Sequence, residues 1–307
     1  MTPEPTLSHR CVVIHEDDVA MTHGANTAFA ELSALGSCSA GSVMVPCPWF
    51  PEAAEMATTN NMLDVGVHLT LTSEKRGYRW RPLTTPSRSA GLTDELGYFW
   101  ADVASVCRNA VPDVVEIELR AQIDTALAAG IDVTHFDAHM GSMNMPEFVE
   151  IYLRLARDYK VPILLVEDIV RCNPAQYADP LTKERYDAVV AEARQAGFPI
   201  FETMIETPWH RLDDTQNAYH EIFRNIPDGL TYLAFHFNAP GDFETVEPEY
   251  AHIRADEYEL FRTPQIAEWL REYYLETIGF RKIRDSLRAY WAGGGCAYAP
   301  TGRSLYP

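Results

Sequence analysis

Three side chains that can bind a metal or move protons stand two residues apart in the stretch Val133–His139: His135, Asp137 and His139. In an extended chain, side chains at positions i, i+2 and i+4 lie on one face of the strand. Two imidazoles and a carboxylate together suit a metal site or an acid–base site better than a core. The alternative is a polar strand end with a hydrogen-bonded histidine, and a second cluster elsewhere in the chain would decide between them.

More polar residues stand at the ends of apolar runs. Asp17 and Asp18 follow one run, His68 lies within another, and His236 ends a third. In parallel α/β folds the carboxyl ends of the strands form one face, and active sites lie there. Histidine nitrogens and carboxylate oxygens suit Zn²⁺ or another divalent transition metal, and three protein ligands plus water leave a position free for catalysis. A metal lowers the pKa of its water, and a nearby carboxylate can take the proton.

Each of these residues also has a purely structural interpretation. Asp17 and Asp18 could cap a helix, and His68 and His236 could be hydrogen-bonded strand histidines. The joint pattern, with each residue at a predicted strand end, favours a site. The remaining histidines have no such partners, and we expect them at the surface: His9, His23, His210, His220 and His252.

The elements that must position these residues alternate along the chain. Apolar runs predict seven or eight strands, at residues 11–14, 42–45, 65–71, 133–139, 161–166, 199–201, 230–235 and 278–280. Helical patterns between them cover residues 22–35, 53–56, 114–129, 146–159, 183–195, 215–223, 266–270 and 285–291. This rhythm is typical of an α/β fold with a parallel sheet, open or closed. We expect an N-terminal extension at residues 1–9, a single domain at residues 10–291 and a loose tail at residues 292–307.

Two long loops interrupt this rhythm. A polar loop at residues ~73–95 contains Tyr78, Trp80 and Arg81, and a loop of this length inside a compact domain is usually functional or disordered. Aromatic faces stack on sugar rings, so these side chains could line a substrate site, although a solvated loop with local packing fits equally well. An acidic loop is predicted from His236 to Asp256.

Composition narrows the function classes. The chain has 307 residues and a formal net charge of −19, which argues against nucleic acid or an anionic membrane surface as a partner. The six cysteines include no CxxC pair, so we expect reduced thiols in a cytoplasmic protein. The N-terminus shows no signal peptide, and no apolar run approaches the ~18 residues of a membrane span. No GxGxxG, P-loop or G-x-S-x-G motif is present.

The residues singled out at the predicted strand ends, Asp17, Asp18, His68 and the cluster His135 to His139, are similar in type and order to those of the YdjC-like carbohydrate deacetylase family. The resemblance covers residues ~10–285. The family opens with a strand followed by A-D-D-x-G and G-x-N, which Asp17–Ala20 and Gly24–Asn26 match in part. The later family landmarks correspond to Ser42–Pro48, Glu52–Ala54, Gly66–Thr72, Glu118–Ile123, Thr134–His139 and, with a spacing difference, Arg254–Leu260.

The resemblance implies a distorted (β/α) TIM-like barrel of parallel strands that hydrolyses an N-acetyl group on a small carbohydrate. By motif position, the metal ligands would be Asp18, His68 and His139. Asp17 would be the general base on the metal-activated water, and His236 a catalytic acid or a substrate contact.

The resemblance gives the neighbouring residues supporting roles. His135 would join the catalytic set by orienting the site, and Asp137 would orient it or contact the substrate. We expect a divalent cation, with zinc favoured on ligand softness and magnesium, manganese and cobalt as alternatives. The sequence does not determine the oligomeric state, and a homo-oligomer remains an option.

The chain departs from the family pattern at several positions around the three ligands. His15 and Glu16 replace small residues, Ala20 replaces a glycine, and Gly141 and Met143 replace two histidines. His236-Phe-Asn238 replaces H-P-G, and Leu165 and Val166 stand where an arginine is usual. Three alternatives to deacetylation stay open: hydrolysis of a non-sugar amide or ester, a degenerate carbohydrate-binding protein, and a structural metal with a closed ligand shell.

Overall fold

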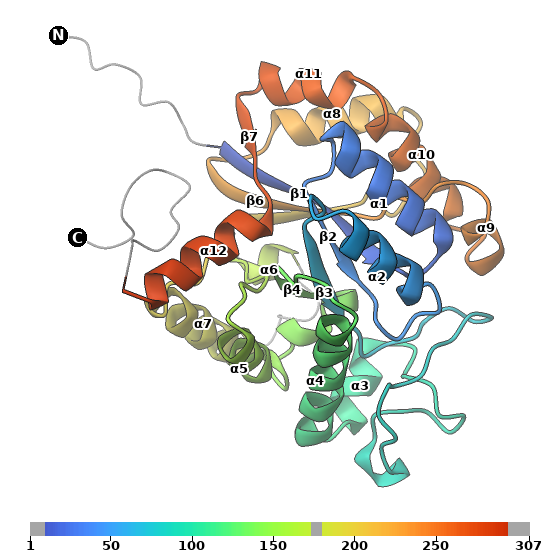
Figure 1. The fold of residues 1–307 in the computed structure, drawn as a ribbon, viewed down its shortest axis with the longest axis vertical. Coiled ribbons are helices and arrows are strands. Elements are labelled where there is room, and N and C mark those ends of the chain that lie inside the picture. The colour runs from blue at the N-terminus through green and yellow to red at the C-terminus, as the bar shows by residue number, and fades with distance from the viewer. Residues whose placement is uncertain (1–9, 173–179, 294–307) are drawn as a thin grey trace.

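Parallel strands occupy the centre of the computed structural model, and helices surround them (Figure 1). The structure describes residues 10–172 and 180–293. The strands are β1 (Arg10–Val19), β2 (Ala40–Val43), β3 (Val65–Leu69), β4 (Phe136–Ala138), β5 (Thr203–Glu206), β6 (Gly229–Phe235) and β7 (Leu275–Thr277). The sheet runs in the order β4-β3-β2-β1-β6-β5, and β7 pairs with the first residues of β1.

The sheet curves into a distorted barrel through the segment 161–166. Single bridges join Phe136 of β4 to Ile163, and Val166 to Phe201, two residues before β5. The amide of Leu164 donates to the carbonyl of Phe136, and the amide of Phe201 donates to the carbonyl of Leu165. The predicted parallel barrel is confirmed, but the strands expected at residues 161–166 and 199–201 are reduced to these bridges.

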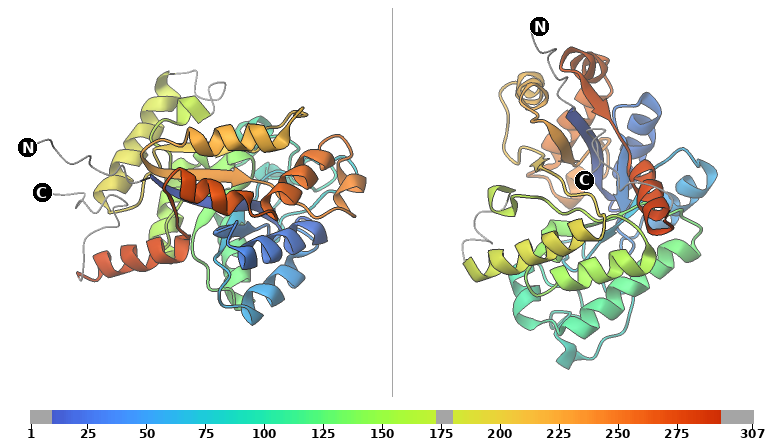
Figure 2. Two further views of the ribbon diagram at one scale, coloured as in Figure 1. Left: turned by 90° about the horizontal axis from the view of Figure 1, so that it is seen from above. Right: turned by 90° about the vertical axis from the view of Figure 1, so that its left-hand side faces the viewer.

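The helices lie outside the strands, and Figure 2 shows α5 and α7 side by side. They are α1 (His23–Leu35), α2 (Phe50–Thr59), α3 (Val103–Asn109), α4 (Pro112–Ala128), α5 (Val149–Tyr159), α6 (Ile169–Cys172), α7 (Pro180–Gln195), α8 (Thr215–Arg224), α9 (Phe243–Val246), α10 (Ala251–Phe261), α11 (Gln265–Glu272) and α12 (Phe280–Trp291). Two short 3₁₀ helices are η1 (Arg88–Ala90) and η2 (His139–Asn144).

Alternation along β1 explains how the barrel is filled. Val12 and Ile14 belong to the large core between the sheet and the helices. Cys11 and Val13 belong to a second, smaller core together with residues of β6 and α12. Side chains two apart share a face of a strand, so this smaller core fills the barrel interior, and His15 points in the same direction.

Local signals explain the helix that follows β1. The Thr22 side chain accepts a hydrogen bond from the amide of Ala25 and so caps α1. Gly36 ends the helix at φ 75, a left-handed conformation that glycine adopts without steric cost. The predicted helix at residues 22–35 is therefore confirmed with its boundaries.

Two predicted elements near the C-terminus were wrong. The expected acidic loop contains α9 and the start of α10, where Asp256 lies on the exposed face of a helix that buries Tyr258 and Phe261. The last strand is β7 rather than residues 278–280, and α12 begins at Phe280.

The sequence also led to expectations about the two ends of the chain and about membrane-spanning helices. The predicted extension at residues 1–9 and most of the predicted tail at residues 292–307 fall outside the described residues. Among the described helices, none combines the length and the apolar character needed to cross a bilayer.

Candidate active site

A bulge in β1 brings two consecutive carboxylates to one site. In a regular strand, neighbouring side chains point to opposite faces. The register between β1 and β2 shifts between Glu16 and Val19, and Asp18 has a left-handed φ of 63. A bulge of this kind redirects a side chain. Both aspartates therefore take part in groups around His68, which β3 supplies.

Asp18, His68 and His139 form a buried cluster with donor atoms within 4.8 Å of one another. Oδ1 of Asp18 lies 3.0 Å from Nδ1 of His139 and 3.4 Å from Nε2 of His68. The same Oδ1 atom is buried and accepts no hydrogen bond, although two imidazole nitrogens face it. Three donor atoms that converge without hydrogen bonding to each other fit a divalent cation, whose ligand distances are about 2 Å.

A carboxylate holds each of these histidines from the side away from the cluster. Asp137 Oδ2 lies 2.9 Å from Nδ1 of His68, and Glu74 Oε2 lies 3.0 Å from Nε2 of His139. Ser42 donates to the same oxygen of Asp137. Carboxylates that accept the outer N–H of a metal-binding histidine fix its tautomer and ring orientation. His68 therefore presents Nε2, and His139 presents Nδ1, toward Asp18.

The charges around the cluster favour added positive charge. Burial alone would lower the pKa of His139, but Glu74 and Asp18 outweigh it and raise that pKa to about 9. Burial would likewise lower the pKa of His68, and Asp137 instead raises it well above its usual value. For Asp18, Arg254 and His139 overcome the effect of burial and hold its pKa well below the usual range. Arg254 donates to Oδ2 of Asp18 at 2.7 Å. The residues present thus fit a divalent cation.

Asp17 belongs to a second hydrogen-bonded group that extends into the barrel. Its Oδ1 lies 2.6 Å from Nδ1 of His15 and 3.2 Å from the hydroxyl of Tyr232, whose single proton is shared with Oδ2 of Asp137 at 3.0 Å. Nε2 of His15 lies 2.8 Å from Nε2 of His135, whose ring stacks on Phe280. Burial and the neighbouring His15 lower the pKa of His135. His135 is connected to Asp17 through His15 and has no contact with solvent.

His236 faces Asp17 from the end of β6. Its Nδ1 lies 2.9 Å from the Thr207 hydroxyl, which donates to Glu257 at 3.0 Å, so Nδ1 is the donor and Nε2 is left as an acceptor. Nε2 lies 3.9 Å from Oδ2 of Asp17. Burial, and then Arg254, lower the pKa of His236 to about 4. His236 and Asp17 are each 13% exposed, whereas the three clustered residues are nearly inaccessible.

Comparison with known proteins places this constellation in a family. The profile of the family described as YdjC-like protein matches residues 11–272. The chain belongs to the YdjC-like family. It is 32% identical to a carbohydrate deacetylase from Thermus thermophilus, over 91% of this chain and 95% of that protein. It is 31% identical to a carbohydrate deacetylase from Listeria monocytogenes, over 89% of this chain and 99% of that protein.

A solved structure has a similar overall fold. A crystal structure from Enterococcus faecalis, described as a cellobiose-phosphate cleavage protein, superposes with a TM-score of 0.73 and covers 89% of this chain and 98% of its own. At 19% identity, this likeness concerns the fold alone.

One departure from the YdjC-like pattern has a structural cost. Ala20, which stands where the family usually has glycine, adopts a left-handed φ of 75. Such a conformation costs an alanine roughly 1–2 kcal/mol, and glycine adopts it freely. The amide of Ala20 donates to Oδ1 of Asn26 at 2.8 Å, which helps to hold this turn directly after the two aspartates.

Of the three residues predicted to line a sugar site, only Trp80 contacts His139, and the three differ in accessibility. Trp80 is 3% exposed, donates from its indole N–H to the carbonyl of Thr72, and lies edge-on to His139 at a ring distance of 6.0 Å. Tyr78 is half-buried and donates to the carbonyl of Met21. Arg81 is exposed and lies over the ring of Tyr98. Their contact with a substrate stays a prediction.

Sequence reasoning missed two charged residues beside the cluster. Glu74 follows the run at β3, so the rule that marked Asp17 and Asp18 as strand-end acids could have found it. Arg254 lies in α10, within a stretch that the resemblance marked without assigning a role. Because that region was predicted as a loop, no periodic signal pointed the guanidinium at Asp18.

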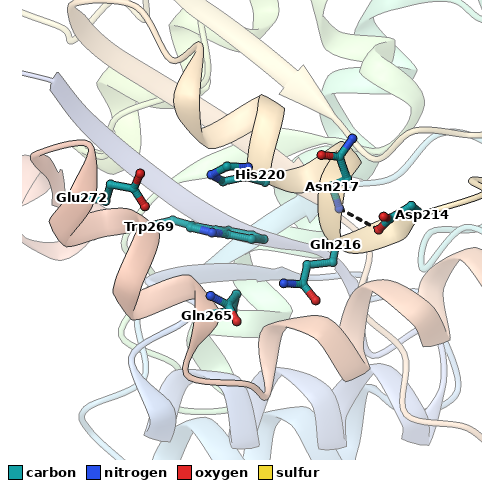
Figure 3. Close-up of a pocket in the computed structure, with 7 residues that line it drawn as sticks. All are labelled: Asp214, Gln216, Asn217, His220, Gln265, Trp269 and Glu272. Carbon is teal, nitrogen blue, oxygen red and sulfur yellow. Dashed lines mark hydrogen bonds between the residues drawn. The ribbon is translucent and has the colours of Figure 1, made fainter.

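A separate surface pocket shares none of these residues. A hollow of about 550 Å³ lies between α8 and α11 (Figure 3). The indole of Trp269 lines it, and His220 lies above that indole in the view at a ring distance of 5.2 Å. Asp214 caps α8 there by accepting from the amide of Asn217. These contacts are accounted for by helix capping and packing, so we assign the pocket no role.

Proposed function

We propose that this chain is a metal-dependent carbohydrate deacetylase that hydrolyses the acetamido group of an N-acetylated sugar. The observation that carries the proposal is the convergence of Asp18, His68 and His139, with Oδ1 of Asp18 buried and free of hydrogen bonds. The relatives from Thermus thermophilus and Listeria monocytogenes, matched over nearly their whole length, supply the substrate class.

The cation would be held by Oδ1 of Asp18, Nε2 of His68 and Nδ1 of His139. It would supply a Lewis acid that polarises the amide carbonyl and lowers the pKa of the attacking water. Asp137 and Glu74 keep the two imidazoles in the required tautomers. Two nitrogens and one oxygen favour zinc, and magnesium, manganese and cobalt are the alternatives to test.

Asp17 is the general base of this proposal. It is next to the cation site but is not held by Arg254, and it is partly open to solvent. His15 and Tyr232 fix its Oδ1 and leave Oδ2 directed toward His236. Oδ2 would take a proton from the water as its oxygen attacks the carbonyl carbon.

His236 completes the proton balance. Hydrolysis consumes one water and breaks the carbon–nitrogen bond. The water's O–H stays on the acetyl carbon as acetic acid, which ionises to acetate in solution, and the other proton of the water must reach the nitrogen. Nε2 of His236 is an acceptor in the neutral ring and faces Asp17. It would receive the proton taken by Asp17 and pass it to the nitrogen, as expected for a general acid–base pair.

Acetate release from N-acetylglucosamine and its short oligomers tests the proposal. The enzyme is assayed with Zn²⁺, Mg²⁺, Mn²⁺ or Co²⁺ after treatment with a chelator. We expect chelation to abolish turnover and one or more of these cations to restore it. If no cation gives acetate from a sugar while a non-sugar amide or ester is cleaved, the substrate class is wrong. Sugar binding without any turnover would indicate a binding protein.

The variant Asp17→Asn separates the base from the ligands. It should keep the bound metal and lose turnover by about a thousandfold or more, in the range expected for a general base. Asp124→Asn, an exposed carboxylate on α4, is the matched control and should leave both unchanged. Loss of metal from Asp17→Asn would make Asp17 a ligand and overturn its assignment as the general base.

A further inference from the structure

Two exposed aromatic side chains stand together beside His236. Trp209 follows β5 and is 38% exposed, and Tyr250 precedes α10 and is 36% exposed. Their ring centroids lie 6.3 Å apart at an interplanar angle of 89°. We name this pair the aromatic rim. Large apolar side chains that remain exposed next to polar groups often mark a binding surface.

Trp209 of the rim is in direct contact with His236, one of the proposed catalytic residues. The ring centroid of Trp209 lies 4.6 Å from that of His236. Arg254, which donates to Asp18, lies 5.4 Å from the same indole. Arg254 is buried beside this ring, whereas Trp209 keeps 38% of its surface accessible to solvent or a ligand.

Trp80, on the His139 side of the cation site, offers no comparable surface. It lies edge-on to His139 but is almost completely buried, and its indole N–H is already used by the carbonyl of Thr72. A sugar ring could not lie on it without moving the loop. Of the two indoles, Trp209 beside His236 and Trp80 beside His139, only Trp209 has an accessible ring.

The position of Trp209 matches the geometry of an acetamido sugar. If Nε2 of His236 is within hydrogen-bond distance of the amide nitrogen, the pyranose ring begins one bond beyond that nitrogen. An indole in contact with His236 is therefore within reach of that ring. The C–H face of a pyranose is apolar, and an aromatic face with polar groups at its edge is the surface that receives it.

We propose that Trp209 is the platform on which the acetylated sugar ring stacks, and that Tyr250 contacts the next ring of an oligosaccharide. Trp209 is then a specificity-determining residue that contacts the sugar ring. This inference rests on the proposed function, because it takes the acetamido group to lie at His236.

Steady-state kinetics with two substrates test the rim. Trp209→Ala should raise KM for N-acetylglucosamine and for its dimer by about tenfold, the loss of one aromatic contact, with kcat reduced less and metal content unchanged. Trp209→Phe, which keeps an aromatic face, should recover most of the loss. Tyr250→Ala should raise KM for the dimer alone. Tyr274→Ala removes an exposed aromatic side chain next to β7, outside the rim, and should change neither constant.

Equilibrium binding separates failure of the rim from failure of the proposed function. The same sugars are titrated calorimetrically into metal-loaded Asp17→Asn, with and without Trp209→Ala. If the wild-type enzyme deacetylates sugars but Trp209→Ala leaves KM and binding unchanged, the rim inference is wrong and the function stands. If no sugar is deacetylated but binding weakens about tenfold with Trp209→Ala, the catalytic proposal fails and the rim stands. If no sugar binds, both are overturned.

Discussion

At the carboxyl ends of the strands the barrel interior holds histidines and carboxylates, whereas at the amino ends it is filled by apolar side chains. The carboxyl ends of the strands form what we call the upper end of the barrel, which contains His15, Asp17, His68, Asp137 and, beside them, His139. The amino ends form the lower end, which contains the smaller core of Cys11, Val13, Leu230, Phe280 and Ile283. Both ends are buried in the same barrel.

The difference shows where the fold accepts an energetic cost. Burying an ionisable group without partners is unfavourable, so such groups are paired or bind metals. At the upper end nearly every polar atom has a partner, and the buried Oδ1 atoms of Asp18 and Asp137 are exceptions. At the lower end packing alone suffices. Changes at the upper end should therefore affect metal and chemistry, and changes at the lower end should affect stability.

His139→Ala should give the largest effect and test the upper end directly. If the three proposed ligands hold the cation, loss of one should remove the metal and lower acetate release by about a thousandfold, which corresponds to roughly 4 kcal/mol. Metal analysis after gel filtration and an acetate assay measure the two losses. His220→Ala, in the pocket between α8 and α11, should retain both metal and activity. Full metal content in His139→Ala would contradict the ligand assignment.

Ile283→Ala tests the lower end. Ile283 is fully buried in the smaller core, and its truncation should lower the free energy of unfolding by about 2–5 kcal/mol through lost burial and a cavity. Chemical denaturation measures this change. Metal affinity and KM of the folded variant should match those of the wild type. A raised KM without lost stability would show that the two ends are coupled.

Glu74→Gln refines the picture of the upper end. The variant keeps the shape of the side chain but weakens its hold on Nε2 of His139, and metal affinity should fall about 10- to 100-fold. Calorimetric titration measures the affinity. Glu95→Gln, an exposed residue in the same loop, is the control. An unchanged affinity would mean that Glu74 does not orient the ligand.

The change of metal affinity with each pH unit should be the smallest of these effects. The pKa of His139 is about 9 and that of His68 is raised, so metal-free protein at neutral pH carries protons that a cation must displace. Affinity should therefore increase from pH 6.5 to about 9. Calorimetry in buffers of different ionisation enthalpy should detect proton release, and its absence at pH 7 would contradict the charged state of His139.

The raised pKa of His139 also determines the direction in which the stability of the metal-free protein changes with pH. The pKa of His139 is raised from 6.5 in the unfolded reference to about 9 in the fold. Its contribution to the stability of the metal-free protein is therefore fully present below pH 6.5 and is lost as the pH rises through about 9. Added metal should reverse this trend, because it binds the deprotonated ring.

Much of the arrangement could be predicted from local sequence. The apolar runs at residues 11–14, 65–71 and 230–235 correspond to β1, β3 and β6, because a strand buried on both faces needs continuous apolar residues. Asp17, Asp18 and His68 were expected together because parallel strands end at one face. The predictions that failed concern a strand at residues 161–166 and a loop where α10 begins. The bridges at residues 161–166 depend on partners far along the chain. Helix α10 has little hydrophobic periodicity for a sequence pattern to detect.

The sequence alone determined which residues could do chemistry, since their types and their positions after apolar runs are local properties. Only the tertiary structure decided how they are used. The bulge turns Asp18 toward His139, the packing of α10 brings Arg254 onto Asp18 from 236 positions away, and the loop after β5 sets Trp209 against His236. These contacts join segments far apart in sequence, and no local pattern specifies the angle at which such segments meet.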